Sequence, residues 1–398
     1  CRLFIEKQGG TKMNSFNYEL KTKTYFGKDI VKLNLPNELE KIGKTVMLAY
    51  GGGSIKRNGI YEEITTILKE AGKTIVEFSG IMPNPTYAKV QAGAKLAKEN
   101  KVDFILAVGG GSVIDCCKII SIQAVNDEDI FELEFTKGIF PTNGTPMGAI
   151  VTASGTGAEM NNGAVITHED KKWKGGMLGA FAKFAFLDPY YTKTLPMTQV
   201  ISGAFDTISH CYETYLGSPR EPNLSDQINE SVMRVVIENM QKLKVNEQDF
   251  EVRSELMWAS SMAENGILKI GKVTDFQAHQ IEHQLGAYTD CNHGQGLAVI
   301  HPVLYRHMVK EGLDQFVRLA KEVWKVDDTN KTKEEVALEG IEALATFIKE
   351  MGLPTTFTQM NITDETVLRE VANTCNISKG CAKQFERDEI FEILKECL

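Results

Sequence analysis

The sequence predicts an α/β protein with two domains, a parallel-sheet domain followed by an all-helical domain. Three observations support this class. Between about residues 22 and 190, short aliphatic and β-branched runs alternate with helical patterns, which is typical of βαβ units in a parallel sheet. After Pro196 apolar residues recur at steps of three and four, which indicates helices. The chain of 398 residues, 42% of them hydrophobic, is long enough for two cores.

The expected elements follow from these patterns in chain order. Five apolar runs predict strands, namely "TVMLAY", "KTIVEF", "DFILAVGGG", "PMGAIVT" and "KFAFLD". Five amphipathic stretches predict later helices, from "TQVISGAFDTISHCYETYL" through "EVRSELMWASSMAENGILKI", "LDQFVRLAKEVWKV" and "KEEVALEGIEALATFIKEM" to "DEIFEILKECL". The turn "LDPYYTKTLP" (187–196) is bracketed by two prolines and places the boundary. We expect domains over 13–196 and 197–398, and residues 1–12, which precede Met13, to be an added segment or an extension.

The composition of the chain limits the classes of molecule that it is expected to bind. A net charge of −9 with scattered Lys and Arg gives no positive surface for nucleic acid or an anionic membrane. The sequence contains no apolar run of about twenty residues that would span a bilayer. Its eight cysteines form no C-x-x-C pair or dense framework, so we expect free thiols in a reducing cytoplasm. A small-molecule substrate is the best expectation.

Two glycine triplets follow predicted strands, in "LAYGGGSIKRNG" (48–59) and "LAVGGGSVIDCCK" (106–118). Glycine allows a ligand to approach the backbone, and a helix start offers free N–H groups to phosphate. Neither triplet is G-x-G-x-x-G, and one alone is more often a plain connection. Two at successive strand ends favour a dinucleotide. The candidate contacts are Gly52, Ser54, Gly110, Gly111, Ser112 and Asp115.

A third loop, "VTASGTGAEMNNG" (151–163), adds Thr152, Thr156 and Asn161, and Lys174 adds a cation. Ser and Thr in loops usually do no more than close turns. The form of the cofactor is open. Ser54 with Lys56 or Arg57 suits the extra phosphate of NADP(H), whereas Glu77 at the end of the second strand favours NAD(H). We expect NADP(H), with NAD(H) as the alternative.

Histidines gather in "FQAHQIEHQLGAYTDCNHG" (276–294), which holds three of the seven in the chain. "HQIEH" matches the H-x-x-E-H signature of one class of zinc peptidase. In "FDTISHCYETY" (205–215), however, Asp206 and His210 stand four apart on one helical face. His279 and His283 repeat that spacing, and His293 follows in a glycine-bounded loop. One carboxylate and two or three imidazoles suit Fe²⁺ or Zn²⁺.

Taken together, these motifs resemble the iron-containing (group III) alcohol dehydrogenases. The resemblance is carried by Asp206-x3-His210, His279, His293, "GGGSVIDCCK" at 109–118 and "TASGTGAE" at 152–159. It extends from about residue 16 to the C-terminus. "YGGGSIKRNGIY", "GIMPNP" and "MWASSMAENG" look most like the butanol dehydrogenase and NADPH-dependent aldehyde reductase branch. The resemblance implies a dehydroquinate synthase-like fold, in which a Rossmann-like nucleotide domain precedes a metal-binding helical domain, and a homodimer.

Residue roles follow from the resemblance. Asp206, His210, His279 and His293 are expected to hold Fe²⁺ or Zn²⁺. His283 is expected near the metal as a non-ligand, and Glu282 becomes an ordinary helix residue. As the nearest titratable side chain, His283 either supplies the proton that reduction requires or only orients a ligand or packs in the helix. Gly52 and Ser54 match the part of the first turn near the 2′-phosphate. The pyrophosphate turn and further cofactor contacts match Gly111 to Asp115, Thr152, Thr156, Asn161 and Lys174.

The expected activity is interconversion of primary alcohols and aldehydes of butanol size, with the metal as Lewis acid and a nicotinamide as hydride carrier. The main alternative is an NAD-dependent polyol dehydrogenase of the same fold, acting on glycerol or propanediol. A dehydroquinate synthase would need a basic cluster near the ligands, which we do not find. A peptidase built on "HQIEH" would leave both glycine turns and Asp206 unexplained.

Overall fold

The structure is a computed structural model that describes residues 13–398. The expectation for residues 1–12 lies outside the described residues. The chain forms two compact units. The first, called the sheet unit, comprises residues 20–196 and 248–261. The second, called the helical unit, comprises the described residues up to 19 together with 197–247 and 262–398.

One helix departs from the predicted division of the chain. Most of α8 (Phe250–Glu264) belongs to the sheet unit, although it lies in the second half of the sequence. Buried Arg253 explains part of this, because its guanidinium donates to the carbonyl of Thr192 at 2.6 Å. The hydroxyl of Ser261 likewise donates to Glu159 at 2.5 Å. These contacts join segments far apart in sequence, so periodicity alone could not predict them.

The sheet unit is built on six parallel strands, which confirms the predicted fold class. Their order across the sheet is β1 (Lys23–Phe26), β8 (Ala182–Leu187), β5 (Met147–Val151), β4 (Phe104–Gly109), β2 (Thr45–Tyr50) and β3 (Thr74–Phe78). All five predicted strands are present, and β1 is an addition. Chain order reverses between β2 and β4, and ligands of open parallel sheets bind beyond the strand ends at such a switch point.

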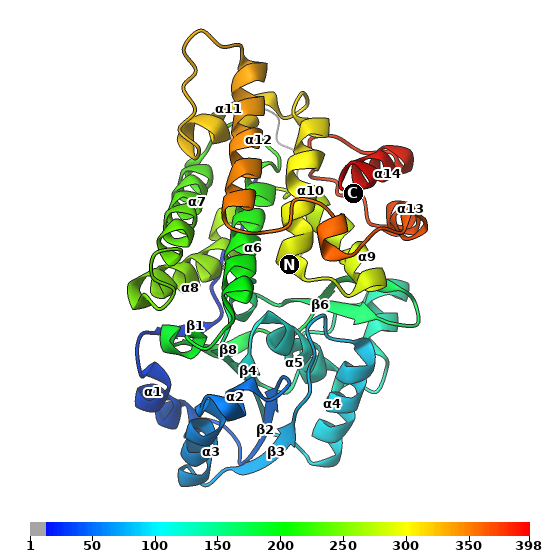
Figure 1. The fold of residues 1–398 in the computed structure, drawn as a ribbon. Coiled ribbons are helices and arrows are strands. Elements are labelled where there is room, and N and C mark those ends of the chain that lie inside the picture. The colour runs from blue at the N-terminus through cyan, green and yellow to red at the C-terminus, as the bar shows by residue number, and fades with distance from the viewer. Residues whose placement is uncertain (1–12) are drawn as a thin grey trace. The chain divides into compact units, whose positions relative to one another are not determined.

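Both faces of the sheet are buried, as the continuous apolar runs indicate. Val46, Leu48 and Tyr50 face one core, which is shared with α1 (Ile30–Leu39) and α3 (Ile60–Glu70). Met47 and Ala49 alternate to the other face and pack against α4 (Tyr87–Glu99) and α5 (Gly111–Gln123). Figure 1 shows these two pairs of helices on opposite sides of the strands. The sheet is therefore a rigid support for the turns at its carboxyl edge.

An antiparallel hairpin supplements the parallel sheet. It consists of β6 (Gly163–His168) and β7 (Trp173–Leu178) and was not predicted. Two glycines in β7 and the lysines around the turn weaken the strand signal in this segment. The hairpin matters because it carries Lys174, one of the predicted cofactor contacts.

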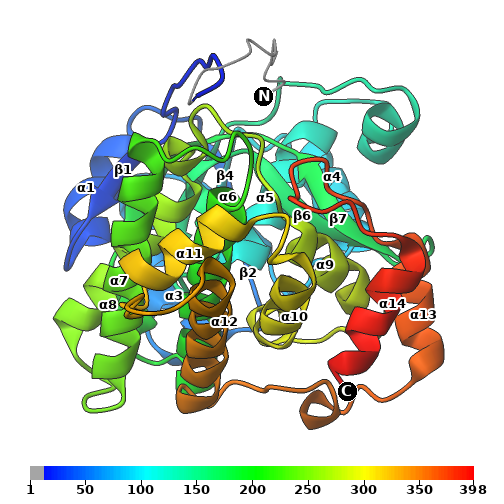
Figure 2. The same ribbon diagram turned by 90° about the horizontal axis from the view of Figure 1, so that it is seen from above.

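The helical unit contains four of the five predicted amphipathic helices, the fifth being α8, and four helices in addition to them. Its helices are α6 (Met197–Tyr215), α7 (Leu224–Leu243), α9 (Gln277–Thr289), α10 (His293–Met308), α11 (Leu313–Glu322), α12 (Lys333–Glu350), α13 (Glu365–Thr374) and α14 (Arg387–Glu396). The four additional helices are α7, α9, α10 and α13. Figure 2 shows α9 beside α10 and α13 beside α14. Between residues 13 and 398, none of the helices is both long and apolar enough to cross a bilayer.

Candidate active site

The predicted metal ligands come from three helices of the helical unit. Asp206 and His210 lie one turn apart on α6, and His279 lies in the first turn of α9. His293 is the first residue of α10 rather than part of a loop, which corrects the expectation. The reason is Asn292, whose side chain accepts from the N–H of Gln295 at 3.1 Å and caps the helix.

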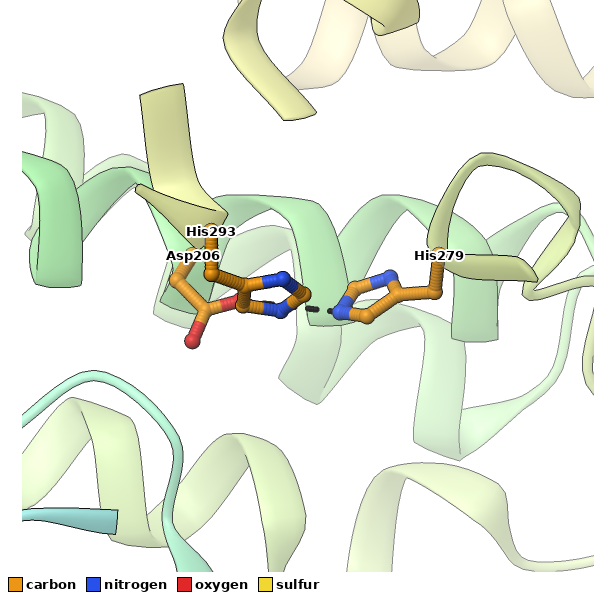
Figure 3. Close-up of side chains that lie close together, drawn as sticks. All are labelled: Asp206, His279 and His293. Carbon is orange, nitrogen blue, oxygen red and sulfur yellow. Dashed lines mark ion pairs between the residues drawn. The ribbon is translucent and has the colours of Figure 1, made fainter. Parts of the chain in front are cut away.

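Their ligand atoms converge on one carboxylate oxygen. Asp206 Oδ1 lies 3.5 Å from His279 Nε2, 3.5 Å from His293 Nε2 and 3.8 Å from His210 Nε2. Asp206, His279 and His293 each place a ligand atom within 4.8 Å of the other two, as Figure 3 illustrates. His210 reaches the same oxygen but is not one of that trio. Atoms bound at about 2.1 Å around a tetrahedral ion stand about 3.4 Å apart, so this spacing fits one divalent cation.

Burial makes the fit more specific. Asp206 and His279 are only 3% and 2% exposed. Asp206 Oδ1 and His279 Nε2 are buried atoms that make no hydrogen bond, whereas the unpaired nitrogen of His210 is Nδ1 and not the Nε2 near Asp206. Buried polar groups without partners are rare in folded proteins, and a bound ion is one way in which such groups are satisfied. Helices α6 and α9 thus present two unpaired donor atoms that a cation would satisfy.

The charges around these ligands favour a bound cation. Burial raises the pKa of the Asp206 carboxyl, but His210, His293 and His279 outweigh it and hold the pKa well below its usual value. Burial lowers the pKa of His279, yet Glu213 and Asp206 raise it to about 10. His210 follows burial, and its pKa is lowered. The carboxylates therefore stay ionised and favour a cation among the imidazoles.

Two buried carboxylates that were not predicted orient these imidazoles. Glu213 on α6 is hydrogen-bonded to Nδ1 of His279, and Glu282 on α9 to Nδ1 of His293. Both glutamate side chains are fully buried. Glu282 is therefore not an ordinary helix residue, which corrects that expectation. A signal for Glu213 was available, because residues 206, 210 and 213 recur on one face of a helix.

His283 lies beside the ligands, where the resemblance placed it. Its ring stacks on that of His293, with centroids 5.4 Å apart, and meets the His279 ring edge-on at 5.7 Å. It is 6% exposed. Glu282, His283 and His293 form a second group whose ligand atoms approach within 4.8 Å of one another. The position suits proton delivery, which stays a prediction.

The two glycine triplets lie on either side of the switch point of the sheet. Gly51 to Gly53 follow β2, and Gly109 to Gly111 join β4 to α5. Gly53 has φ +96°, a conformation that favours glycine. A Cβ on Gly111 would lie 2.3 Å from Thr156 Oγ1, and one on Gly110 would lie 3.1 Å from the Ala153 Cβ. Close approach of the third loop thus requires glycine in the second turn.

That third loop is fastened to strand β4 and to α8. The N–H of Thr152 donates to Gly109 O at 2.9 Å. The N–H groups of Gly155 and Gly157 donate to the buried hydroxyl of Ser260 at 2.9 and 3.1 Å. Ser260 was not predicted, since only the folded chain brings α8 to this loop. Thr156 is thereby held against Gly111, next to Ser112 at the start of α5.

Asp115 and Asn161 meet around a buried lysine. Lys118 Nζ donates to Asp115 Oδ1 and to Asn161 Oδ1, both at 3.2 Å. Asp115 Oδ2 also accepts from the N–H of Val165 at 2.9 Å. These bonds fasten the β6–β7 hairpin, on which Lys174 is buried. The sequence motif therefore has a structural role here, and contact of these residues with a cofactor stays a prediction.

The first glycine turn contains the residues on which the choice between NADP(H) and NAD(H) depends. Ser54 begins the short helix α2 (Ser54–Arg57), and a Cβ on Gly52 would have no atom within 4 Å. Glu77 is engaged by its neighbours: it accepts from the hydroxyls of Tyr50, at 2.8 Å, and Tyr61, and lies 3.7 Å from Lys56 Nζ. A carboxylate held in this way is less free to bind ribose hydroxyls, so the arrangement favours the NADP(H) expectation.

Substitution of two glycines tests the packing of these turns. Gly111→Ala should lower the free energy of unfolding by about 1–3 kcal/mol, because overpacking forces the Thr156 loop to move. Gly52→Ala is the matched control. It should change the free energy of unfolding by less than about 0.5 kcal/mol, as substitutions at open surface sites do. Denaturant unfolding measures both. Equal effects of the two substitutions would contradict the close approach.

Comparisons with known proteins give matches over both parts of the chain. Residues 21–189 match the family described as iron-containing alcohol dehydrogenase, and residues 200–398 match the C-terminal domain of the Fe-containing alcohol dehydrogenase family. The chain is 39% identical to the probable NADH-dependent butanol dehydrogenase 1 of Bacillus subtilis (strain 168), over 97% of this chain and 100% of that protein. It is 34% identical to the NADPH-dependent aldehyde reductase YqhD of Escherichia coli (strain K12), over 86% and 88%.

A solved structure extends the likeness to the fold. The crystal structure of NADH-dependent butanol dehydrogenase A from Thermotoga maritima superimposes with a TM-score of 0.90 at 33% identity. The match covers 98% of this chain and 100% of that one.

Proposed function

Because this chain belongs to the iron-containing alcohol dehydrogenase family, we propose that it reduces aldehydes of about butanal size with NADPH at a divalent-cation centre. The general class of reaction follows from the family. The chain is an NAD(P)-dependent alcohol dehydrogenase that interconverts alcohols and aldehydes, and it uses a metal and a nicotinamide cofactor. Its metal, its cofactor form and its substrate are the proposed parts.

One observation carries the proposal: ligand atoms of Asp206, His279 and His293 converge, and two of these atoms, Asp206 Oδ1 and His279 Nε2, are buried without a hydrogen bond. We assign the cation to these three residues and His210. One carboxylate with imidazoles suits Fe²⁺ or Zn²⁺, and the family description favours iron. When bound, the cation supplies Lewis acidity towards the carbonyl oxygen and the nicotinamide supplies reducing equivalents.

The side chains of the protein then have separate tasks. Asp206, His210, His279 and His293 hold the cation, and the imidazole of His283 delivers the proton that an aldehyde oxygen requires on reduction. In the sheet unit, the proposed cofactor contacts are Gly52, Ser54, Gly110, Gly111, Ser112, Asp115, Thr152, Thr156, Asn161 and Lys174. The N–H groups at the start of α5 suit the pyrophosphate.

A preference for NADP(H) is supported by the first turn. The surroundings of Gly52 are open, Lys56 and Arg57 supply positive charge on α2, and Glu77 is engaged by Tyr50, Tyr61 and Lys56. The relatives differ here: the Bacillus subtilis protein is named as NADH-dependent and the Escherichia coli protein as NADPH-dependent. NAD(H) is accordingly the competing candidate.

Gly52→Asp tests this preference. A carboxylate fits the open space at residue 52 and should repel a 2′-phosphate, so we expect the ratio of kcat/KM for NADPH over NADH to fall about tenfold or more, since about 1.4 kcal/mol of repulsion suffices. Gly52→Asn has the same size without the charge and is the control. A ratio that falls equally in both variants would contradict the proposed 2′-phosphate position.

Two further proposals concern the state of the protein. Every cysteine among residues 13–398 is a free thiol, which supports a reducing cytoplasm. The homodimer implied by the family resemblance is proposed as well, and light scattering of purified protein would measure it. A polyol dehydrogenase with NAD(H) is the alternative activity of the same site.

The deciding assay is oxidation of NADPH and NADH by the metal-loaded protein with butanal, with hydroxyacetone as the ketone of a polyol, and with a chelator-treated control. We expect the highest kcat/KM for NADPH with butanal. Higher kcat/KM for hydroxyacetone with NADH would overturn the proposed substrate and cofactor in favour of the polyol alternative.

A further inference from the structure

Glu213 joins two helices of the metal centre through its side chain. Its Oε1 accepts from the N–H of Ala278 at 2.6 Å and from the N–H of His279 at 3.2 Å. Its Oε2 is hydrogen-bonded to His279 Nδ1. The backbone carbonyl of Glu213 also accepts from the N–H of Asp275 at 2.8 Å. One residue of α6 therefore bonds to Asp275, just before α9, and to Ala278 and His279 in its first turn.

Helix α9 relies on this carboxylate for the N–H groups of Ala278 and His279, because Asp275 Oδ1 accepts only from the preceding N–H, that of Gln277, at 3.0 Å. Its N-cap residue is Phe276, which has φ 57° and makes no side-chain capping bond. The first N–H groups of a helix need partners from elsewhere, and a negative charge near them is stabilising. Glu213, which is fully buried, provides both.

The same carboxylate determines which nitrogen of His279 faces the metal centre. An ionised carboxylate can only accept hydrogen bonds, so Nδ1 of His279 must carry the hydrogen. In the neutral imidazole that a metal ligand must be, Nε2 then carries the lone pair, and this atom lies 3.5 Å from Asp206 Oδ1 and makes no hydrogen bond. A histidine ligand needs one such unprotonated nitrogen directed at the ion.

We infer that Glu213 is the positioning residue of the metal centre: a single carboxylate fixes the start of α9 on α6 and holds His279 in its ligating tautomer. This inference rests on the proposed function of the site as a metal centre. It assigns Glu213 no contact with substrate or cofactor.

Glu282 offers an internal comparison. It is hydrogen-bonded to His293 Nδ1 in the same way, and its other oxygen accepts from the thiol of Cys291 at 3.7 Å. A glutamine at 282 can turn its carbonyl oxygen towards His293. A glutamine at 213 cannot satisfy both sides, because its NH₂ group must face either the start of α9 or the Nδ1–H of His279.

The test compares the metal affinity of Glu213→Gln, Glu282→Gln and Glu230→Gln proteins by competition of Zn²⁺ and Co²⁺ with a chelator. We expect Glu213→Gln to weaken binding about 10- to 100-fold, the range for residues that orient ligands, and Glu282→Gln to weaken it less. Glu230 is a matched control, because it is a buried carboxylate of the same unit that bonds to Tyr215 and Arg318 instead. Its variant should lose thermal stability but bind both ions as the wild type does.

The visible spectrum of the Co²⁺ protein adds a second measurement, which reports the surroundings of the bound ion and does not depend on the stability of the fold. It should change shape in Glu213→Gln and not in Glu230→Gln. Wild-type affinity and spectrum in Glu213→Gln, or equal losses in Glu213→Gln and Glu230→Gln, would overturn the inference. If Glu213→Gln does not fold, ¹⁵N spectra of zinc-loaded wild-type protein decide: a hydrogen on Nδ1 of His279 supports the inference, and its absence refutes it.

These results are separable from the proposed function. Tight metal binding by the wild type without aldehyde reduction would refute the function and leave the role of Glu213 intact. Aldehyde reduction together with unchanged metal affinity in Glu213→Gln would do the reverse.

Discussion

Asp206→Asn is expected to abolish aldehyde reduction, because it removes the negative charge around which the three imidazole ligands gather. Asp206 is 3% exposed, and its Oδ1 lies within 3.8 Å of three imidazoles. Loss of one partner from a buried charged pair costs about 3–5 kcal/mol, which corresponds to about two to three and a half powers of ten in metal affinity. Metal analysis after dialysis and the butanal assay measure both consequences.

A matched control distinguishes loss of the metal from general destabilisation of the protein. Asp226→Asn removes another buried carboxylate of the helical unit, one that pairs with Lys272 instead of histidines. It should destabilise the protein and leave its metal content unchanged. Full metal content and activity in Asp206→Asn would show that the cation binds elsewhere.

His283→Ala is expected to cause the second largest loss of activity. It should lower kcat without changing the metal content of the protein. The His283 ring lies beside those of His279 and His293 but is assigned to proton delivery rather than to the metal. Removal of a general acid typically costs about 10²-fold or more in rate. We therefore expect kcat with butanal to fall by about that factor while metal content stays that of the wild type.

The control for this variant is His307→Ala, because His307 pairs with Glu396 at 3.0 Å in the last turn of α10 and is partly exposed. It should leave kcat unchanged. Loss of the metal from His283→Ala would show that His283 is a ligand, and unchanged kcat would remove it from the reaction.

The parallel sheet could be predicted because its strands are buried on both faces. Runs such as Val46 to Tyr50 are continuously apolar, and this pattern needs no knowledge of the partners. Strand β1 is four residues long and half exposed, and the β6–β7 hairpin is rich in glycine and lysine, so neither carries that signal. The assignment of α8 to the sheet unit depends on Arg253 and Ser260, whose partners are more than fifty residues away.

Helical spacing is local and therefore grouped the candidate residues, but the choice of His293 rather than His283 as a ligand came from the family resemblance and stays a prediction. Asp206 with His210, and His279 with His283, each share a helix face at four-residue spacing. The residues that orient the ligands were missed for the opposite reason. Glu282 acts on His293 of the next helix, and Glu213 acts on His279 of another helix, so their roles depend on how α6, α9 and α10 pack. The pairing of Asp115 and Asn161 through Lys118 is likewise a product of the folded hairpin.

The central claim is that Asp206, His210, His279 and His293 form one divalent-cation site that the reaction requires. The most direct measurement is titration of metal-free protein with Fe²⁺ under anaerobic conditions, and separately with Zn²⁺, while NADPH oxidation by butanal is followed. We expect no activity without metal and activity that rises linearly to a plateau at one ion per chain. Aldehyde reduction by the metal-free protein, or a plateau reached without any metal bound at this site in Asp206→Asn, would contradict the claim.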